Sequence, residues 1–213
     1  MTATEPTTDF VDLRFALQGR VVCLDYADAL TRALTRALPW LDVAQGAGVH
    51  PLGGLSPGDD GWYLSGRTRL TLRLPRCRVE DARQLTGETL VVGGHELRVG
   101  ACSERPLAHA SVVYASFVSF GVEPGGGIID ETVFLDRCRR ELETLNLSPR
   151  LVCGKAHQIK VAAGLLSGFS LMVADLDVAG TLRLQERGLG CERLRGCGLF
   201  VPHKSMRSVT TLE

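Results

Sequence analysis

The 213-residue sequence has no apolar run that approaches the ~20 consecutive residues needed to cross a bilayer as a helix. Its first residues, MTATEPTTDF, also lack the basic stretch followed by an apolar stretch that marks a secretory signal peptide. These absences argue against a helical membrane protein and against a secreted one. We therefore expect a soluble, cytoplasmic protein with no membrane partner. A chain of this length has room for one large domain or for two domains of roughly 100 residues each.

Metal-binding patterns are missing as well. The seven cysteines form no CxxC pair, and the five histidines do not supply the short spacings of a zinc site. The sequence also has no cluster of carboxylates like those that hold paired Mg²⁺ ions. The number of cysteines is odd, and disulfide frameworks are typical of smaller secreted chains. We therefore expect reduced thiols, no metal ion and no other cofactor.

The chain has no excess of charge of either sign, since 24 basic and 24 acidic side chains balance. This balance argues against an unspecific polyanion binder, which is usually basic overall. The charge is segregated, however, because residues 149–164 contain no acid and residues 187–207 contain only Glu192. The basic residues of these two stretches are Arg150, Lys155, Lys160, Arg187, Arg193, Arg195, Lys204 and Arg207. A basic C-terminal region on a neutral chain indicates a local anionic partner.

The first half of the chain alternates strand and helix patterns. Residues 10–17 alternate apolar and polar side chains, which predicts a half-buried strand. Residues 25–38 place leucine and alanine at three- and four-residue spacing, which predicts an amphipathic helix that ends before Pro39. The other elements that we expect are a loop at 46–61, strands at 62–64 and 70–74, a short helix at 79–85 and a strand pair at 89–99.

The second half repeats this order. We expect a strand at 111–120, a link at 121–127, a helix at 131–145, strands at 151–161 and 165–175, a short helix at 181–186, a glycine-rich loop at 188–198 and a last strand at 199–201. Both halves therefore follow the β-α-β-β-α-β order of a ferredoxin-like unit. The sequence predicts an α+β fold with two tandem ferredoxin-like (RRM-like) units, at residues 1–108 and 109–213.

Residues 188–204, GLGCERLRGCGLFVPHK, are rich in glycine and precede the last expected strand. Glycine allows positive φ and close approach to a ligand, and exposed amides in such a loop form an anion-binding concavity. Arg193 and Arg195 lie inside the loop, and guanidinium groups pair with phosphate in bidentate fashion. The stretch is not a Walker loop, which follows a strand and opens a helix with GK[ST]. An ordinary flexible connection is the alternative interpretation.

The pattern GLG-x-x-R-x-x-GCG-x-F-x-P-x-K in this stretch resembles the glycine-rich loop of CRISPR repeat-processing endoribonucleases of the RAMP superfamily. In that family the loop precedes the last strand of the C-terminal ferredoxin-like unit. The segments VDLRFALQG, LPWL, VHPLGG, LTLRLP and GFSLMVADL look like the small subtype first described in myxobacteria, so the resemblance covers nearly the whole chain. The matching positions of the loop are Gly188, Leu189, Gly190, Arg193, Gly196, Cys197, Gly198, Phe200, Pro202 and Lys204.

The resemblance implies that the protein binds the repeat of a precursor CRISPR RNA and cuts it once per repeat into guide RNAs. In this family the cut uses the 2′-hydroxyl beside the scissile phosphate, needs no metal and leaves a 2′,3′-cyclic phosphate. Many members then stay bound to the RNA as subunits of an interference complex. The residues that we expect to contact RNA are Gly188, Gly190, Arg193, Arg195, Gly196, Gly198, Lys204, His157 and Lys160.

The catalytic residues that we expect are Tyr26, His50 and Lys155. In relatives a histidine commonly follows an aspartate at the start of the first helix, whereas this sequence has Asp25-Tyr26. Tyrosine, with a pKa near ~10, is a poor base, but it can orient a hydroxyl or donate a proton, and some members use it with a histidine and a lysine. His50 is suited to acid–base work. Lys155 shares one face of its expected strand with His157, which suits phosphate contact.

Two other functions remain open. The Asp25-Tyr26 pair favours a catalytically inactive RNA-binding RAMP subunit of a CRISPR ribonucleoprotein, which a cleavage assay on the matching repeat distinguishes from a nuclease. A ferredoxin-like protein–protein module, in which the glycine loop only packs against a partner, would not bind RNA. The candidate residues also have plain interpretations: Tyr26 as an interface tyrosine, His50 as an exposed loop histidine and residues 155–157 as a charged strand face.

Overall fold

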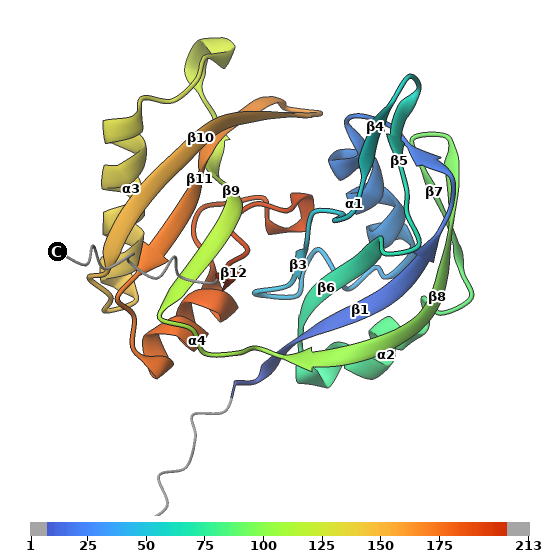
Figure 1. The fold of residues 1–213 in the computed structure, drawn as a ribbon, viewed down its shortest axis with the longest axis horizontal. Coiled ribbons are helices and arrows are strands. Elements are labelled where there is room, and N and C mark those ends of the chain that lie inside the picture. Colours follow the sequence, from blue (N-terminus) through green and yellow to red (C-terminus); the bar gives the residue numbers. More distant parts are fainter. Residues whose placement is uncertain (1–7, 204–213) are drawn as a thin grey trace, which may run out of the picture.

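The computed structural model describes residues 8–203, which form two antiparallel sheets with helices and a small third sheet (Figure 1). The first half contains β1 (Phe10–Gln18), β2 (Val21–Val22), α1 (Tyr26–Ala37), β3 (Gly48–Val49), β4 (Ser56–Gly58), β5 (Gly61–Tyr63), β6 (Arg69–Pro75), η1 (Arg76–Arg78), α2 (Val79–Arg83), β7 (Thr89–Val92) and β8 (His95–Pro106). The second half contains β9 (Val112–Val122), η2 (Pro124–Gly126), α3 (Glu131–Thr144), β10 (Arg150–Val161), β11 (Gly164–Ala174), α4 (Val178–Arg187), η3 (Arg193–Arg195) and β12 (Val201–Pro202).

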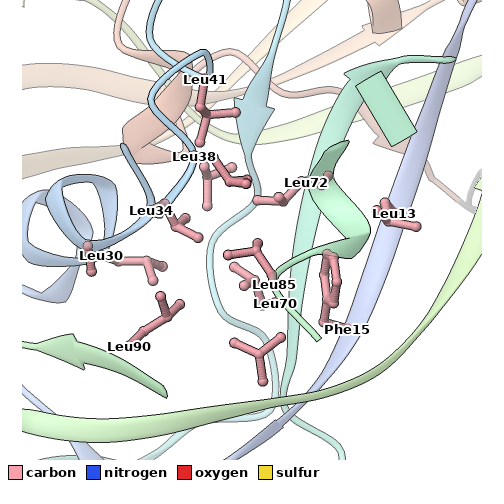
Figure 2. Packing of buried hydrophobic residues seen from close by; sticks show 14 of the residues in the cluster. Leu13, Phe15, Leu30, Leu34, Leu38, Leu41, Leu70, Leu72, Leu85 and Leu90 are labelled. Carbon is pink, nitrogen blue, oxygen red and sulfur yellow. The ribbon is translucent and has the colours of Figure 1, made fainter. Parts of the chain in front are cut away.

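The first sheet has the strand order β3-β6-β1-β8-β7. In β1 the alternation predicted from the sequence is confirmed, because Val11, Leu13 and Phe15 are at most 1% exposed while the residues between them face the other side of the sheet. The buried face packs against the leucines of α1, among them Leu30 and Leu34 (Figure 2). One face of this sheet is thereby closed by an apolar core, and the other face is left with polar side chains.

The second sheet has the strand order β10-β11-β9-β12. The strand β9, which comes first in the chain, therefore pairs with β11 and with β12. The side chain of Asp130 caps α3 by accepting hydrogen bonds from the amides of Thr132 and Val133. The buried face of α3, with Phe134 and Cys138, packs on this sheet. The predicted α+β fold with ferredoxin-like units is therefore confirmed.

Two predictions about the first half are wrong in detail. The stretch 46–61 is not only a loop, because it contains β3 and β4, and β3 pairs with β6 at the edge of the main sheet. The strand expected at 62–64 lies one residue earlier, as β5, in a separate sheet of order β2-β5-β4. Strands of two or three residues are too short to show a periodicity, so the sequence does not reveal them. The division at residue 108, which lies between β8 and β9, stays a prediction about folding units.

Within residues 8–203, none of the helices combines the length and the apolar character that a membrane crossing requires.

Candidate active site

A cavity of about 500 Å³ lies where the two halves of the chain meet. Its lining comes from the start of α1, the loop after β3, the middle of β9, the end of β10 and η3. Tyr26, His50, His157 and Arg195 all line it, although they are far apart in the sequence. The fold therefore brings together a phenol, two imidazoles and a guanidinium, which are the groups that acid–base chemistry on a phosphodiester requires.

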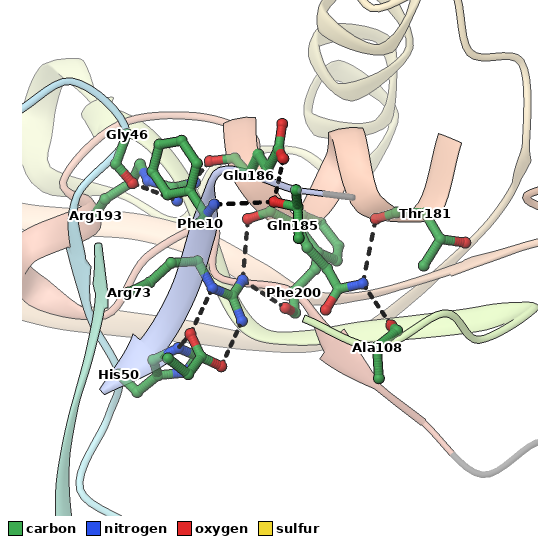
Figure 3. Close-up of polar contacts among 12 residues, drawn as sticks. Phe10, Gly46, His50, Arg73, Ala108, Thr181, Gln185, Glu186, Arg193 and Phe200 are labelled. Carbon is green, nitrogen blue, oxygen red and sulfur yellow. Dashed lines mark hydrogen bonds and ion pairs between the residues drawn. The ribbon is translucent and has the colours of Figure 1, made fainter. Parts of the chain in front are cut away.

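A buried ionic network holds His50 at the cavity wall (Figure 3). The Nε2 atom of His50 lies 3.2 Å from Oδ1 of Asp12. Arg73, which is fully buried, donates from Nε and Nη2 to the two carboxylate oxygens of Asp12 at 2.8 and 2.9 Å. Its Nη1 donates to the carbonyl oxygens of Gln185 and Phe200 at 3.0 and 2.8 Å. The same arginine therefore orients the carboxylate beside His50 and joins the two halves.

The contact with Asp12 determines which nitrogen of His50 is basic. A carboxylate only accepts hydrogen bonds, so Nε2 carries the proton and Nδ1 has the free lone pair. Burial lowers the pKa of His50 below its ordinary value, the hydrogen bond that His50 donates to Asp12 opposes this fall, and the positive charges of Arg73 and Arg193 add to it. Burial raises the pKa of Asp12, but the bonds from His50 and Arg73 outweigh this effect and hold the pKa well below its usual range. His50 is therefore a neutral imidazole, beside a charged carboxylate, near pH 7.

Tyr26 has the opposite character. Its hydroxyl oxygen accepts a hydrogen bond from the amide of Leu52 at 3.0 Å. Burial raises the pKa of Tyr26 above its ordinary value, and the Leu52 amide lowers it only in part. No acceptor for the phenol proton is found among residues 8–203. Tyr26 is therefore a neutral phenol whose proton is available in the cavity, so it is suited to be an acid and not a base.

Several amides of the glycine-rich loop are engaged within the protein, and anion binding by this loop stays a prediction. Its amides already donate within the protein, for example that of Gly190 to Oε2 of Glu141 at 2.7 Å and that of Gly198 to the carbonyl of Phe117 at 2.8 Å. A side chain at Gly190 would overlap the carbonyl oxygen of Ser119. Gly188, Gly190, Gly196 and Gly198 all adopt the positive φ that glycine allows. These glycines allow the loop to pack closely on the protein itself.

The two arginines of the loop are also engaged internally. Nη2 of Arg193 donates to the carbonyl oxygens of Gly46 and Glu186, both at 2.9 Å, and burial lowers the pKa of this side chain to about 10. In this conformation the guanidinium of Arg193 points inward, and its contact with RNA phosphate stays a prediction. Arg195 pairs with Asp28 at 2.8 Å and with Glu192, yet it lines the cavity at its partly exposed end.

The candidates on β10 are divided by position. His157 lines the cavity and meets the ring of Phe117 edge-on, with 6.2 Å between ring centroids. Lys155 and Lys160 are exposed and are not part of the cavity wall, so the structure does not place Lys155 with Tyr26 and His50. Gly196 lines the cavity through its close approach to Pro51. Lys204 lies outside the described residues.

Asp12 and Arg73 belong to the candidate site but were not among the residues predicted from the sequence. A usable signal was present, because Asp12 and Arg73 both lie at polar positions of alternating strands. The register of the sheet pairs these two residues directly. Among residues 8–203 there is no group of three or more His, Cys, Asp or Glu side chains that could hold a metal ion.

Comparisons with known proteins agree with this fold. The family model described as Cas6 Crispr matches residues 11–205. The CRISPR-associated endonuclease Cas6 of Myxococcus xanthus is 35% identical over 193 residues, which cover 91% of this chain and 81% of that protein. A solved Cas6-related protein from Pyrococcus furiosus superimposes with a TM-score of 0.65 at 13% identity, over 90% of this chain and 97% of that one. A solved RAMP protein described as binding different RNA substrates gives 0.64 at 12% identity, over 91% and 100%.

The two solved structures are too distant in sequence to show more than the fold. The family model and the Myxococcus xanthus relative each extend over most of the chain. The chain therefore belongs to the Cas6 family of CRISPR-associated endonucleases.

Proposed function

We propose that the protein cleaves the repeats of precursor CRISPR RNA in the cavity between its halves, without a metal ion, by attack of a 2′-hydroxyl on the adjacent phosphate. The observation that carries this proposal is the convergence of a neutral imidazole, His50, and a protonated phenol, Tyr26, in one cavity. These are the base and the acid that an in-line transfer needs. The name of the Myxococcus xanthus relative, an endonuclease, supports the same reaction class.

In the proposed reaction, His50 is the general base and Tyr26 is the general acid. The 2′-hydroxyl transfers its proton to Nδ1 of His50 while its oxygen bonds to phosphorus. The bond from phosphorus to the 5′-oxygen breaks, and Tyr26 gives its proton to that oxygen. The products are a 2′,3′-cyclic phosphate and a 5′-hydroxyl. Asp12, which is hydrogen-bonded to Nε2, stabilises the imidazolium that forms.

Cleavage of repeat RNA by His50→Ala tests this proposal. Loss of one general base typically slows a reaction by about 10² to 10⁴, so we expect that loss in the single-turnover rate with nearly unchanged RNA affinity. His109→Ala is the matched control, because His109 is exposed and does not line this cavity. Tyr26→Phe should slow the reaction as well, since the phenol proton is lost while the ring remains.

Two substrate and buffer conditions test the reaction type separately from the residues. EDTA should leave the rate unchanged, and a 2′-deoxy nucleotide before the scissile phosphate should abolish cleavage because the nucleophile is absent. Cleavage of the deoxy substrate, or inhibition by EDTA, would contradict the mechanism. A parent protein that binds the repeat but never cuts it would identify the inactive RNA-binding subunit instead.

We also propose that the processed RNA remains bound and that the complex joins an interference ribonucleoprotein. This rests on the resemblance to RAMP proteins. After single-turnover cleavage, gel filtration should show the cyclic-phosphate product co-eluting with the protein, and a product that elutes alone would contradict retention.

A further inference from the structure

A second cavity, of about 510 Å³, opens on the other side of His50 and Pro51. Its floor is the polar face of the first sheet, and its opposite wall includes Gln185, Val201 and Pro202 from the second half. Since His50 and Pro51 line both cavities, the two are neighbours separated by the proposed base. We call this second cavity the arginine groove because its lining contains Arg14, Arg67, Arg69 and Arg105.

The register of the sheet explains why these charges gather. On β1 the polar face is formed by residues 12, 14 and 16, since 11, 13 and 15 are buried. Arg105 is paired with Asp12, and Arg69 is paired with Ala16. Directly paired residues of an antiparallel sheet project to the same side. Arg14, Arg69 and Arg105 therefore share the face that points away from the leucine core.

The positive charge of the groove is not compensated by the protein. Asp12 is the only acid in the lining, and its carboxylate is already occupied by Arg73 and His50. Within residues 8–203, none of the four groove arginines forms an ion pair with a carboxylate. Arg69 donates only to carbonyl oxygens, those of Gly66 and Thr68. Clustered like charges repel one another, so an arrangement in which no acid is free to pair with the arginines indicates a site for an anion.

The arginines of the glycine-rich loop are engaged by groups of the protein itself. Arg193 is turned inward onto carbonyl groups, and the charge of Arg195 is offset by Asp28 and Glu192. The groove arginines are therefore cationic groups that remain available beside the candidate active site. Guanidinium groups favour bidentate contacts with phosphate oxygens.

We propose that the arginine groove binds the phosphodiester backbone of the RNA strand that continues from the scissile phosphate. This assignment rests on the proposed function, because it takes the substrate to be RNA that is cut at His50. The strand then passes His50 with its phosphates in the groove on one side and with a base or sugar in the more apolar cavity of Tyr26 and Phe117 on the other. Such contacts position the strand without reading its sequence.

The test measures binding of repeat RNA in which every 2′-hydroxyl is replaced by fluorine, so that it cannot be cleaved. Arg14→Gln and Arg105→Gln should each weaken binding and reduce the slope of log affinity against log salt by roughly one unit, as for a lost phosphate contact. A scrambled RNA of equal length should lose affinity equally. Arg140→Gln is the matched control, because Arg140 is exposed on α3, outside both cavities, and should leave affinity and slope unchanged.

The outcomes separate this assignment from the proposed function. If the groove variants bind with the parent's salt slope while the parent binds and cuts the repeat, the groove assignment is overturned and the proposed function stands. If poly-glutamate displaces the RNA as well as an RNA competitor of equal charge does, the groove is an acidic-peptide site and the assignment is also overturned. A parent that neither binds nor cuts repeat RNA overturns both. Thermal unfolding of each variant confirms that it is folded.

Discussion

His50 lies between an apolar cavity and a basic one, and its protonation state determines whether it can accept a proton. Burial is the largest influence on its pKa and lowers it, whereas Asp12 raises it. A base must be unprotonated to act, so activity should be lost as the pH falls through this lowered pKa. The structure therefore predicts that the acid limb of the pH–rate profile lies below the ordinary histidine value of 6.5.

The substitution Asp12→Asn tests the origin of this limb. Without the carboxylate, the influence that raises the pKa of His50 is removed, so the acid limb should move to still lower pH while the maximal rate falls, because the imidazolium is no longer stabilised. Single-turnover rates across the pH range measure both effects. Asp59→Asn, an exposed aspartate outside both cavities, is the control. A limb that stays in place in Asp12→Asn would show that Asp12 does not position or tune the base.

At the scale of elements, the glycine-rich loop packs against α1 and β9 and holds η3 in place. The hydroxyl of Thr31 on α1 donates to the carbonyl of Leu194 at 2.7 Å, and the amide of Cys191 donates to the carbonyl of Ser119 at 2.9 Å. These contacts, together with the pair of Arg195 and Asp28, hold the wall of the candidate active site in place. The loop therefore contributes to the shape of this cavity.

The substitution Gly198→Ala separates crowding from backbone strain. Gly198 has φ +66°, and an added Cβ would overlap the carbonyl oxygen of Leu189. Gly125 has φ +80° with nothing within 4 Å of an added Cβ, so Gly125→Ala carries the strain alone, about 1 kcal/mol. Gly198→Ala should lower the free energy of unfolding by several times that amount, as urea denaturation would show. Equal losses in the two variants would mean that the loop is not closely packed.

At the scale of the whole molecule, the two halves are joined by polar contacts that neither half can make alone. Arg73 of β6 reaches the carbonyls of Gln185 and Phe200, Arg193 reaches back to Gly46, and Thr8 donates to Glu186. Both cavities take walls from both halves. We therefore expect the proposed units 1–108 and 109–213 to depend on one another for stability.

The substitution Arg73→Met tests this dependence. It leaves the carboxylate of Asp12 and two carbonyl groups without their partner, and breaking such a buried pair typically costs about 3–5 kcal/mol. Urea unfolding should show a loss of that size, and Asp12→Asn/Arg73→Met should recover part of it because the unpaired charge is gone. Arg14→Met, on the same sheet face but without a carboxylate partner, is the control. A loss no greater than that of Arg14→Met would contradict the role of Arg73 as the link between halves.

Much of the fold could be predicted from local patterns. The alternation at 10–17 and the helical spacing at 25–38 each correspond to an observed element, because burial on one face imposes a period that a single segment displays. The short strands β3 and β4 could not be predicted, since their pairing depends on β6 and β5 and not on their own residues.

The candidate site was predictable only in part. Tyr26 was selected from the family resemblance and His50 and His157 from their chemistry, and the fold brings all three to one cavity, where their roles stay predictions. The roles of the arginines could not be predicted from the sequence. Every arginine carries the same charge, and its partners come from distant segments of the chain.

The sequence by itself determined the period of each long element and the kinds of acid–base groups available. Only the tertiary structure decided which charges are satisfied. Arg193 lies in the basic C-terminal stretch yet is buried against carbonyl groups. Arg14 and Arg105, at opposite ends of the first half, instead lie on one sheet face and have no acid partner among residues 8–203. The physical reason is that the burial and pairing of a charge depend on strand register and on the contact between the halves, which no local segment contains.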